Sequence, residues 1–273
     1  MTGSTVGEAL AKSWLAPIDA QVLLAHVVGR ERSWLVAHRD DALTRAEADA
    51  FAALVARRRA GEPVAYLVGQ REFWGLMLTV TPAVLVPRPE TETLVELALE
   101  RLPADRTVRV LDLGTGSGAI ALAIASERSR AEVVAVDVST AALAVARGNA
   151  DALGLRHVTF RESDWYADVG AAPFDVIVSN PPYVAAGDPH LAQDDLRHEP
   201  RGALVAGVDG LGALRTIVAG APARLVPGGA LVVEHGYDQA EAVQGLLRAA
   251  GFDNVVGRRD LAGIVRVAAG RLA

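Results

Sequence analysis

Three glycines spaced two residues apart constrain this chain most. Gly114, Gly116 and Gly118 follow an apolar, strand-like segment at 108–113 and precede a helix-like segment at 119–127. Glycine allows a sharp turn and lets a ligand approach the bare backbone. The pattern therefore predicts a strand, a ligand-binding loop and a helix in succession, which is a building unit of α/β sheets.

Strand-like and helix-like segments alternate through the chain after residue 89. The predicted strands cover residues 108–113, 133–137, 158–160, 175–179, 230–234 and 264–268. Helical stretches at 91–101, 119–127 and 140–153 fall between the early strands. This order predicts an α/β fold in which helices cover both faces of a Rossmann-like sheet.

The first part of the chain has a different sequence pattern. Residues 1–62 show helical patterns and no strand-like alternation. Thr44 and Glu47 form a capping-box pattern at the start of one helix, and Gly61 with Pro63 ends it. We therefore expect a small helical domain at the N-terminus.

The residues that join these two parts are β-prone. Segments 73–80 and 84–86 flank a turn signal at Thr81-Pro82, which predicts a hairpin-like connector. The predicted division of the chain is a helical domain at 1–70, a β-hairpin connector at 71–86 and an α/β domain at 87–273.

Composition excludes several classes of function. The chain has no cysteine, which rules out disulfides and thiolate metal sites, and its histidines lack the spacing of metal ligands, so we expect no metal. No apolar run reaches the roughly 18 residues of a membrane span, and residues 1–12 lack a signal-peptide pattern. We expect a cytoplasmic protein with no membrane partner. The formal net charge of −6 comes entirely from residues 87–273, and the lack of a basic track argues against direct binding of nucleic acid.

A carboxylate follows the glycine loop at the end of the next predicted strand. Asp137 comes 19 residues after the third glycine, where it can accept hydrogen bonds from both hydroxyls of a ribose. This indicates an adenosine-type cofactor. Gly114, Gly116 and Ala119 also fit the relaxed dinucleotide fingerprint. Asp112 would repel a pyrophosphate and suits a cationic ligand, so it favours S-adenosylmethionine, as does the third glycine.

Asn180-Pro181-Pro182-Tyr183 follows the predicted strand at 175–179. It should lie at the same rim as the glycine loop, because ligands bind at the carboxyl ends of the strands. The prolines remove backbone N–H donors, which leaves the Asn180 side-chain oxygen and the Pro181 carbonyl as acceptors and Tyr183 as a flat face. Two acceptors can hold both N–H bonds of an NH2 group on a planar π-system. The tetrapeptide therefore predicts N-methylation.

Further motifs extend over nearly the whole sequence. They lie at 63–69, 72–75, 85–92, 112–118, 163–165, 180–183 and 198–204. With them the chain resembles the protein-(glutamine-N5) methyltransferases that modify class I peptide-chain release factors. The Pro-Arg-Pro-Glu-Thr-Glu segment at 87–92 is the most specific to that family, whereas Asn-Pro-Pro-Tyr is shared with adenine-N6 and other amino methyltransferases.

The resemblance implies an S-adenosyl-L-methionine-dependent methyltransferase sheet and a helical N-terminal domain that docks the release factor. The substrate would be the glutamine of the factor's Gly-Gly-Gln motif, methylated on its side-chain amide nitrogen (N5). The residues implied in cofactor binding are Gly114, Thr115, Gly116, Ser117, Gly118, Asp137, Trp165 and Asn180. The residues implied in holding the glutamine are Asn180, Pro181, Pro182 and Tyr183, of which Asn180, Pro181 and Tyr183 would act in catalysis. We expect a monomer.

The residues alone leave other readings open. Adenine or guanine amino groups would suit the same acceptors, a protein could bind the cofactor without catalysis, and the glycine loop also permits a nicotinamide cofactor. Trp165 is as readily a packing residue as an adenine platform. Arg88, Glu90 and Glu92 open a helix, where glutamates commonly serve the helix dipole. Glu199 lies in a polar loop after the site; it could fold over the substrate, but we expect it to be solvated.

Overall fold

The computed structural model describes residues 4–192 and 195–273, which fall into two compact units. The first, here called the helical unit, comprises residues 1–70 and 192–198, and the second, the sheet unit, comprises residues 71–191 and 199–273. Residues 1–3 of the predicted N-terminal domain lie outside the described residues. The division of the chain at 70 and 86 stays a prediction.

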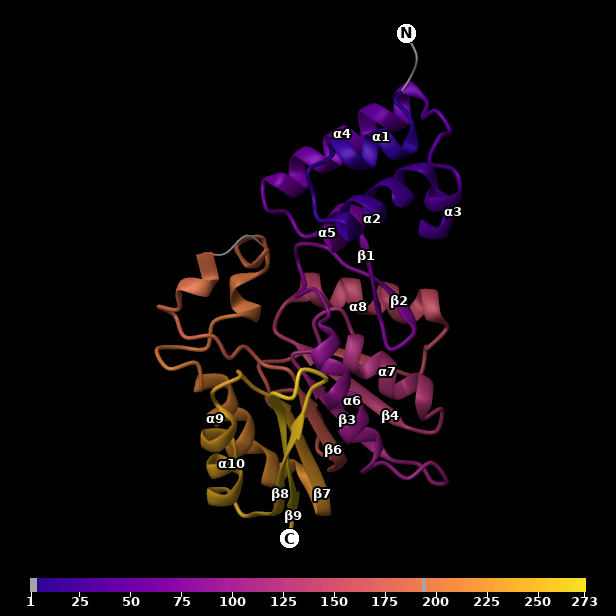
Figure 1. Ribbon diagram of the computed structural model, residues 1–273. Coiled ribbons are helices and arrows are strands. Elements are labelled where there is room, and N and C mark those ends of the chain that lie inside the picture. The colour runs from indigo at the N-terminus through magenta and orange to yellow at the C-terminus, as the bar shows by residue number, and fades with distance from the viewer. Residues whose placement is uncertain (1–3, 193–194) are drawn as a thin grey trace. The chain divides into compact units, whose positions relative to one another are not determined.

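Short helices packed around one apolar cluster make up the helical unit (Figure 1). They are α1 (Val6–Lys12), α2 (Pro17–Val28), α3 (Arg32–Ala37), α4 (Arg45–Arg59) and α5 (Val64–Val68). The predicted capping box is present at the start of α4, where the Thr44 hydroxyl accepts from the Glu47 N–H and the Glu47 carboxylate accepts from the Thr44 N–H. Leu23, Leu24 and Phe51 are buried in this cluster.

A β-hairpin precedes the large sheet, but its turn is not at the predicted place. Strands β1 (Gln70–Phe73) and β2 (Leu76–Thr79) are joined at Trp74-Gly75, and residues 84–86 form no strand. Both turn residues have positive φ, 55° and 71°, which glycine adopts freely and tryptophan rarely does. The Trp74 N–H donates to Glu92 and its ring N–H to Glu127, so contacts distant in sequence hold a turn that local propensity does not predict.

In the described residues, seven strands form the main sheet in the order β5-β4-β3-β6-β7-β9-β8. Its strands are β3 (Arg109–Leu113), β4 (Glu132–Asp137), β5 (Thr159–Glu162), β6 (Phe174–Ser179), β7 (Leu225–Glu234), β8 (Phe252–Arg259) and β9 (Val265–Leu272). Strands β5, β4, β3, β6 and β7 run parallel to one another. Strand β9 pairs antiparallel with β7, and β8 pairs antiparallel with β9. The chain order reverses between β3 and β6, which is where sheets of this kind open a ligand site.

Helices cover both faces of this sheet, as predicted (Figure 1). They are α6 (Glu92–Leu99), α7 (Ala119–Glu127), α8 (Thr140–Leu153), α9 (Gly212–Gly220) and α10 (Ala240–Ala249). Short 3₁₀ turns lie at Pro89–Thr91, Pro189–Ala192, Leu196–His198, Arg201–Ala203 and Ala221–Arg224. Strand β8 and helices α9 and α10 had no sequence prediction; β8 is an edge strand with mostly exposed side chains, so it carries little apolar signal.

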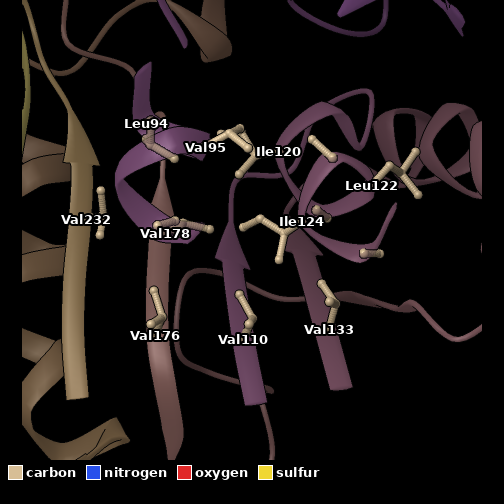
Figure 2. Packing of buried hydrophobic residues seen from close by; sticks show 14 of the residues in the cluster. Leu94, Val95, Val110, Ile120, Leu122, Ile124, Val133, Val176, Val178 and Val232 are labelled. Carbon is tan, nitrogen blue, oxygen red and sulfur yellow. The ribbon is translucent and has the colours of Figure 1, made fainter. Parts of the chain in front are cut away.

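Alternate side chains of the strands supply two separate cores. Val110 and Val176 face α6 and α7, whereas Leu111 and Ile177 face the opposite layer with α9 and α10. Figure 2 shows the first core, in which Leu94, Val95, Ile120 and Ile124 lie over Val110, Val176 and Val178. Each fully buried aliphatic side chain contributes about 1.5–3 kcal/mol. Because the strands are buried on both faces, their register is fixed. The register in turn decides which residues lie at the strand ends.

Candidate functional site

A cavity of about 330 Å³ opens at the carboxyl ends of β3, β4 and β6. All of its lining residues belong to the sheet unit. They include Ala83–Leu85, Pro87, Arg88, Thr91, Gly114–Ser117, Ala119, Ile120, Asp137–Ser139, Ala142, Ser163–Trp165, Asn180, Pro182, Pro200, Gly202 and Ala203. The volume lies in the range of small-molecule sites.

The glycine loop forms one wall of the cavity with its backbone. The Gly114 and Thr115 N–H groups donate to the Val136 carbonyl at 2.9 Å, and the Gly116 N–H donates to Asp137 Oδ2 at 2.9 Å. Gly118 does not line the cavity. A Cβ there would lie 3.0 Å from Leu122 Cδ1 in addition to a φ of 86°, so this third glycine permits the close packing of α7.

Asp137 stands where a ribose-binding carboxylate is expected. It is half-buried, lines the cavity, and accepts N–H groups from Gly116 and Ser139 at 2.9 Å each. Each of its oxygens accepts only one of these bonds, and a carboxylate has about four acceptor positions. The backbone thus holds the carboxylate in place and leaves acceptor capacity for two hydroxyls.

Asp112 is fully buried behind the loop. Its Oδ2 accepts the Thr115 hydroxyl at 2.7 Å, and Oδ1 has no hydrogen-bond partner in the part of the chain that the structure describes. Burial raises the pKa of this carboxyl to about 7. A cationic ligand nearby would favour the charged form. The set of a cavity wall made of glycine-loop backbone, a ribose acceptor and a buried carboxylate fits S-adenosyl-L-methionine.

Trp165 lines the same cavity, next to Ser163 and Asp164. Its φ of 48° is unusual for a residue with a side chain, and such backbone strain clusters at ligand sites. The Ser163 hydroxyl donates to the Trp165 carbonyl at 3.0 Å and accepts from the Asp168 N–H at 2.8 Å. These bonds hold the turn that presents the indole ring.

The Asn-Pro-Pro-Tyr segment directly follows β6, and the structure separates its members. Asn180 and Pro182 line the cavity, whereas Pro181 is buried and Tyr183 packs on the second core. Asn180 donates from Nδ2 to Thr91 Oγ1 at 3.1 Å. Its Oδ1 is buried and has no partner among the described residues. An unsatisfied amide oxygen in a cavity wall is an acceptor available to a ligand N–H.

Glu234, the last residue of β7, lies behind this segment and was not singled out from the sequence. It is fully buried, and its Oε1 accepts the Tyr183 hydroxyl at 3.3 Å. Burial raises the pKa of Glu234 to about 7, although the Thr91 and Tyr183 hydroxyls and Arg266 favour its charged form. Burial also raises the pKa of Tyr183, so this phenol stays a donor. The one sequence signal was an acidic residue that ends a buried strand.

Glu199 corrects an expectation, because it is not solvated. Its side chain is completely buried and pairs with the Arg88 guanidinium, while the Val86 N–H donates to its Oε2 at 3.1 Å. The polar sequence around it misled the prediction, because the partners come from residues more than a hundred positions away. The pair fixes the Pro-Arg-Pro segment against the loop that carries Pro200, Gly202 and Ala203.

Neither a metal centre nor a membrane-spanning helix is found within residues 4–192 and 195–273. No group of three or more His, Cys, Asp or Glu there could hold a metal ion, and no helix there is long and apolar enough to cross a membrane.

Comparisons with known proteins agree with this geometry. A family model described as the PrmC N-terminal domain matches residues 7–69, and one described as the methyltransferase small domain matches residues 91–208. The release factor glutamine methyltransferase of Bordetella pertussis is 55% identical over 264 residues, covering 96% of this chain and 97% of that protein. The protein of the same name from Salmonella typhimurium is 49% identical, covering 93% and 91%.

A solved structure supports the fold. The 16S rRNA N2 G1207 methyltransferase of T. thermophilus, in complex with AdoMet and guanosine, shares 25% identity with a TM-score of 0.56, covering 75% of this chain and 50% of that one. Identity of about one half over nearly the full length of several relatives is decisive: this chain belongs to the release factor glutamine methyltransferase family.

Proposed function

We propose that the chain transfers a methyl group from S-adenosyl-L-methionine to the side-chain amide nitrogen (N5) of the glutamine in the Gly-Gly-Gln motif of class I release factors. The observation that carries the proposal is the unsatisfied Asn180 Oδ1 in the wall of a cavity that also holds the glycine loop and Asp137. A primary amide offers the two N–H donors that such an acceptor wall requires.

The residues around the glycine loop would hold the cofactor. When bound, S-adenosyl-L-methionine supplies an electrophilic methyl group on a sulfonium. The backbone of the loop from Gly114 to Ser117 would lie against its main chain, the Asp137 carboxylate would bind its ribose, and Trp165 would stack on its base. The buried Asp112 would favour its positive charge.

The acceptor side would orient the glutamine amide. Asn180 Oδ1 and the Pro181 carbonyl would each accept one N–H bond, so the nitrogen faces the methyl donor. An amide nitrogen is a weak nucleophile because its lone pair is delocalised, and the nitrogen becomes positive as it is methylated. Hydrogen bonds to charged groups contribute about 1.5–3 kcal/mol, more than neutral ones, so both acceptors bind the transition state more tightly than the substrate. The cationic product then loses its proton to water.

The partner and setting follow from the same proposal. The relatives carry release factors in their names, and we propose such a factor as the protein substrate, with the helical unit as its docking surface. Action on a translation factor places the protein in the cytoplasm. We propose a monomer that binds neither nucleic acid nor membrane directly.

The test is label transfer to an intact substrate. The full chain is incubated with methyl-labelled S-adenosyl-L-methionine and a class I release factor, and label in the factor is measured. We expect incorporation that disappears when the glutamine of Gly-Gly-Gln is replaced by alanine. Incorporation that survives this replacement, or none at all, would contradict the proposal.

A parallel arm addresses nucleobase amino groups, which the same acceptors would suit. DNA and RNA are incubated with labelled cofactor in the absence of release factor. We expect no label in either, since the sheet unit carries a net negative charge.

A further inference from the structure

One buried side chain of α8 bonds to two segments that lead into the cavity wall. Asn149 is 1% exposed, and its Nδ2 donates to the Ser117 carbonyl at 2.9 Å. The same amide meets the backbone of Thr79, the last residue of β2. Its Nδ2 donates to the Thr79 carbonyl at 3.0 Å, and its Oδ1 accepts the Thr79 N–H at 2.7 Å. Asn149 thus joins the glycine loop to the end of the hairpin.

The backbone fixes the direction of these three bonds. An N–H group can only donate and a carbonyl oxygen can only accept. The Thr79 N–H must therefore meet the amide oxygen of Asn149, and both carbonyls must meet its NH2, whose two hydrogens are then both used. An ionised aspartate in this place would set its oxygens against two carbonyls, and a leucine would offer no partner to any of the three backbone groups.

Both bonded segments continue into the cavity wall. Ser117 is buried with 3% of its surface exposed and lines the cavity together with 114–116. The chain that leaves Thr79 turns where the Val84 N–H donates to the Thr81 carbonyl at 3.1 Å, and it lines the cavity at 83–85. Asn149 itself does not line the cavity, so it can influence a ligand only through these two segments.

Small side chains let α8 approach the loop closely enough for this contact. Ala142, Ala146 and Asn149 recur at helical spacing, which places them on one face of α8. Ala142 lines the cavity, and a Cβ on Gly118 would lie 3.3 Å from Ala146 Cβ. The short side chain of Asn149 reaches the Ser117 carbonyl from the same face, so the helix and the loop are held at close range.

We propose that Asn149 is a positioning residue for the cofactor, because it holds the glycine-loop wall and the 83–85 segment at the separation that S-adenosyl-L-methionine requires. This inference rests on the proposed function, in which the cavity binds that cofactor. It adds to that function a side chain outside the cavity on which cofactor affinity depends. Asn180 bonds to Thr91 instead, so the methyl-transfer step itself should be spared.

Calorimetry of cofactor binding is the first test. Asn149→Ala removes the partner of two carbonyls and one N–H group, and we expect affinity for S-adenosyl-L-methionine to weaken about 5- to 30-fold, with kcat at saturating cofactor within about threefold of wild type. Asn149→Asp keeps the size and the acceptor but loses both donors, and it should weaken affinity at least as much.

A variant in the other core provides the control. Leu247→Ala truncates a fully buried side chain of α10, which packs in the second core. It should lower the temperature of thermal unfolding, whereas its affinity for the cofactor should stay within about twofold of wild type. Every variant is measured well below its own unfolding temperature, so that the folded state alone is compared.

Hydrogen exchange in the cofactor-free protein gives a second readout. Peptides that cover 80–86 and 114–118 should exchange about tenfold faster in Asn149→Ala than in wild type, while peptides that cover α10 should exchange at the wild-type rate. Leu247→Ala should show the reverse pattern. If Asn149→Ala does not fold, Asn149→Asp, which keeps the size of the side chain, serves for both measurements.

The outcomes are distinct. If wild-type protein does not bind S-adenosyl-L-methionine, the proposed function is wrong, and the exchange pattern alone decides the role of Asn149. If wild-type protein binds but Asn149→Ala binds within about twofold of it, or if exchange at 80–86 and 114–118 is unchanged, this inference alone is overturned. An equal loss of affinity in Leu247→Ala would also overturn it, because affinity would then follow general stability.

Discussion

The two walls of the cavity are built in different ways. On the cofactor wall, the backbone of the glycine loop lines the cavity, and it is held by the Asp137 carboxylate and by the Val136 carbonyl. On the acceptor wall, side chains form the site: Asn180 donates to Thr91, and behind it Tyr183 donates to the buried Glu234.

This difference explains what each wall contributes. A backbone wall is rigid and cannot reverse its donors, which suits tight binding of one cofactor. A side-chain wall can reverse, because an amide presents either an oxygen or an NH2. Asn180 donates its NH2 to Thr91, which leaves its amide oxygen without a partner among the described residues. Substitutions on the acceptor wall should therefore lower kcat, whereas substitutions on the cofactor wall should weaken cofactor affinity.

The largest expected effect is on the acceptor wall. Asn180→Ala removes the acceptor that faces the substrate, and we expect kcat to fall by about 10²–10³. Cofactor affinity, measured by calorimetry, should change by less than about tenfold, because the glycine loop and Asp137 remain. A loss of kcat below tenfold would mean that Asn180 has another role.

The matching substitution on the cofactor wall should give the opposite pattern. Asp137→Ala removes the acceptor for the ribose hydroxyls and also releases the Gly116 and Ser139 N–H groups. We expect cofactor affinity to weaken about 10- to 100-fold, as for one or two hydrogen bonds to a charged group. At saturating cofactor, kcat should be close to that of the wild type. Equal losses in affinity and kcat would contradict the separation of the two walls.

A smaller effect is expected on stability at the rim. Arg88→Met removes the guanidinium that pairs with the buried Glu199 carboxylate, and we expect the free energy of unfolding in urea to fall by about 1–3 kcal/mol. The control is Arg215→Met, which breaks a pair with Asp209 whose side chains are both 50% exposed. That change should leave the free energy of unfolding nearly unchanged, because exposed ion pairs contribute little. Equal losses of unfolding free energy in the two variants would show that burial of Glu199 does not strengthen its pair with Arg88.

The smallest effect concerns the pH dependence of stability. Burial raises the pKa of Asp112 from its ordinary 3.8 to about 7, so the folded state binds a proton that the unfolded state has lost. The stability from this proton is full below pH 3.8 and is lost as the pH rises through about 7. Asp112→Asn should flatten this decline.

The same measurement with cofactor present sharpens the comparison. A cationic ligand on the glycine-loop wall should lower the pKa of Asp112 and flatten the decline in wild-type protein, while the share from Glu234 remains. Urea unfolding at several pH values measures the slope of the unfolding free energy against pH, with and without S-adenosyl-L-methionine. An unchanged slope on adding cofactor would place its charge away from Asp112.

The sequence predicted the cofactor wall better than the acceptor wall for a physical reason. The glycine loop and Asp137 lie within one β-α-β unit, so their spacing alone predicts where they meet, and the predicted α7 and α8 have the observed bounds. The Rossmann-like fold and the family are confirmed by the sheet and by the relatives. The roles assigned to individual site residues stay predictions.

The acceptor wall draws on three distant segments. Asn180 meets Thr91 because α6 begins near the end of β6, and Tyr183 meets Glu234 because β6 and β7 are neighbours; no local pattern encodes either meeting. Glu199 was misread for the same reason, since Arg88 and Val86 lie far away in the sequence. The hairpin turn at Trp74 was missed because tertiary hydrogen bonds override its poor turn propensity.

The position of the transferred methyl group tests the central claim most directly. A release factor treated with the full chain and isotopically labelled S-adenosyl-L-methionine is digested and sequenced by tandem mass spectrometry. We predict the label on the side-chain amide of the glutamine in Gly-Gly-Gln, and its loss with Asn180→Ala under conditions that saturate the cofactor site. A label on any other residue, or the same label from the Asn180→Ala variant at the wild-type rate, would contradict the account.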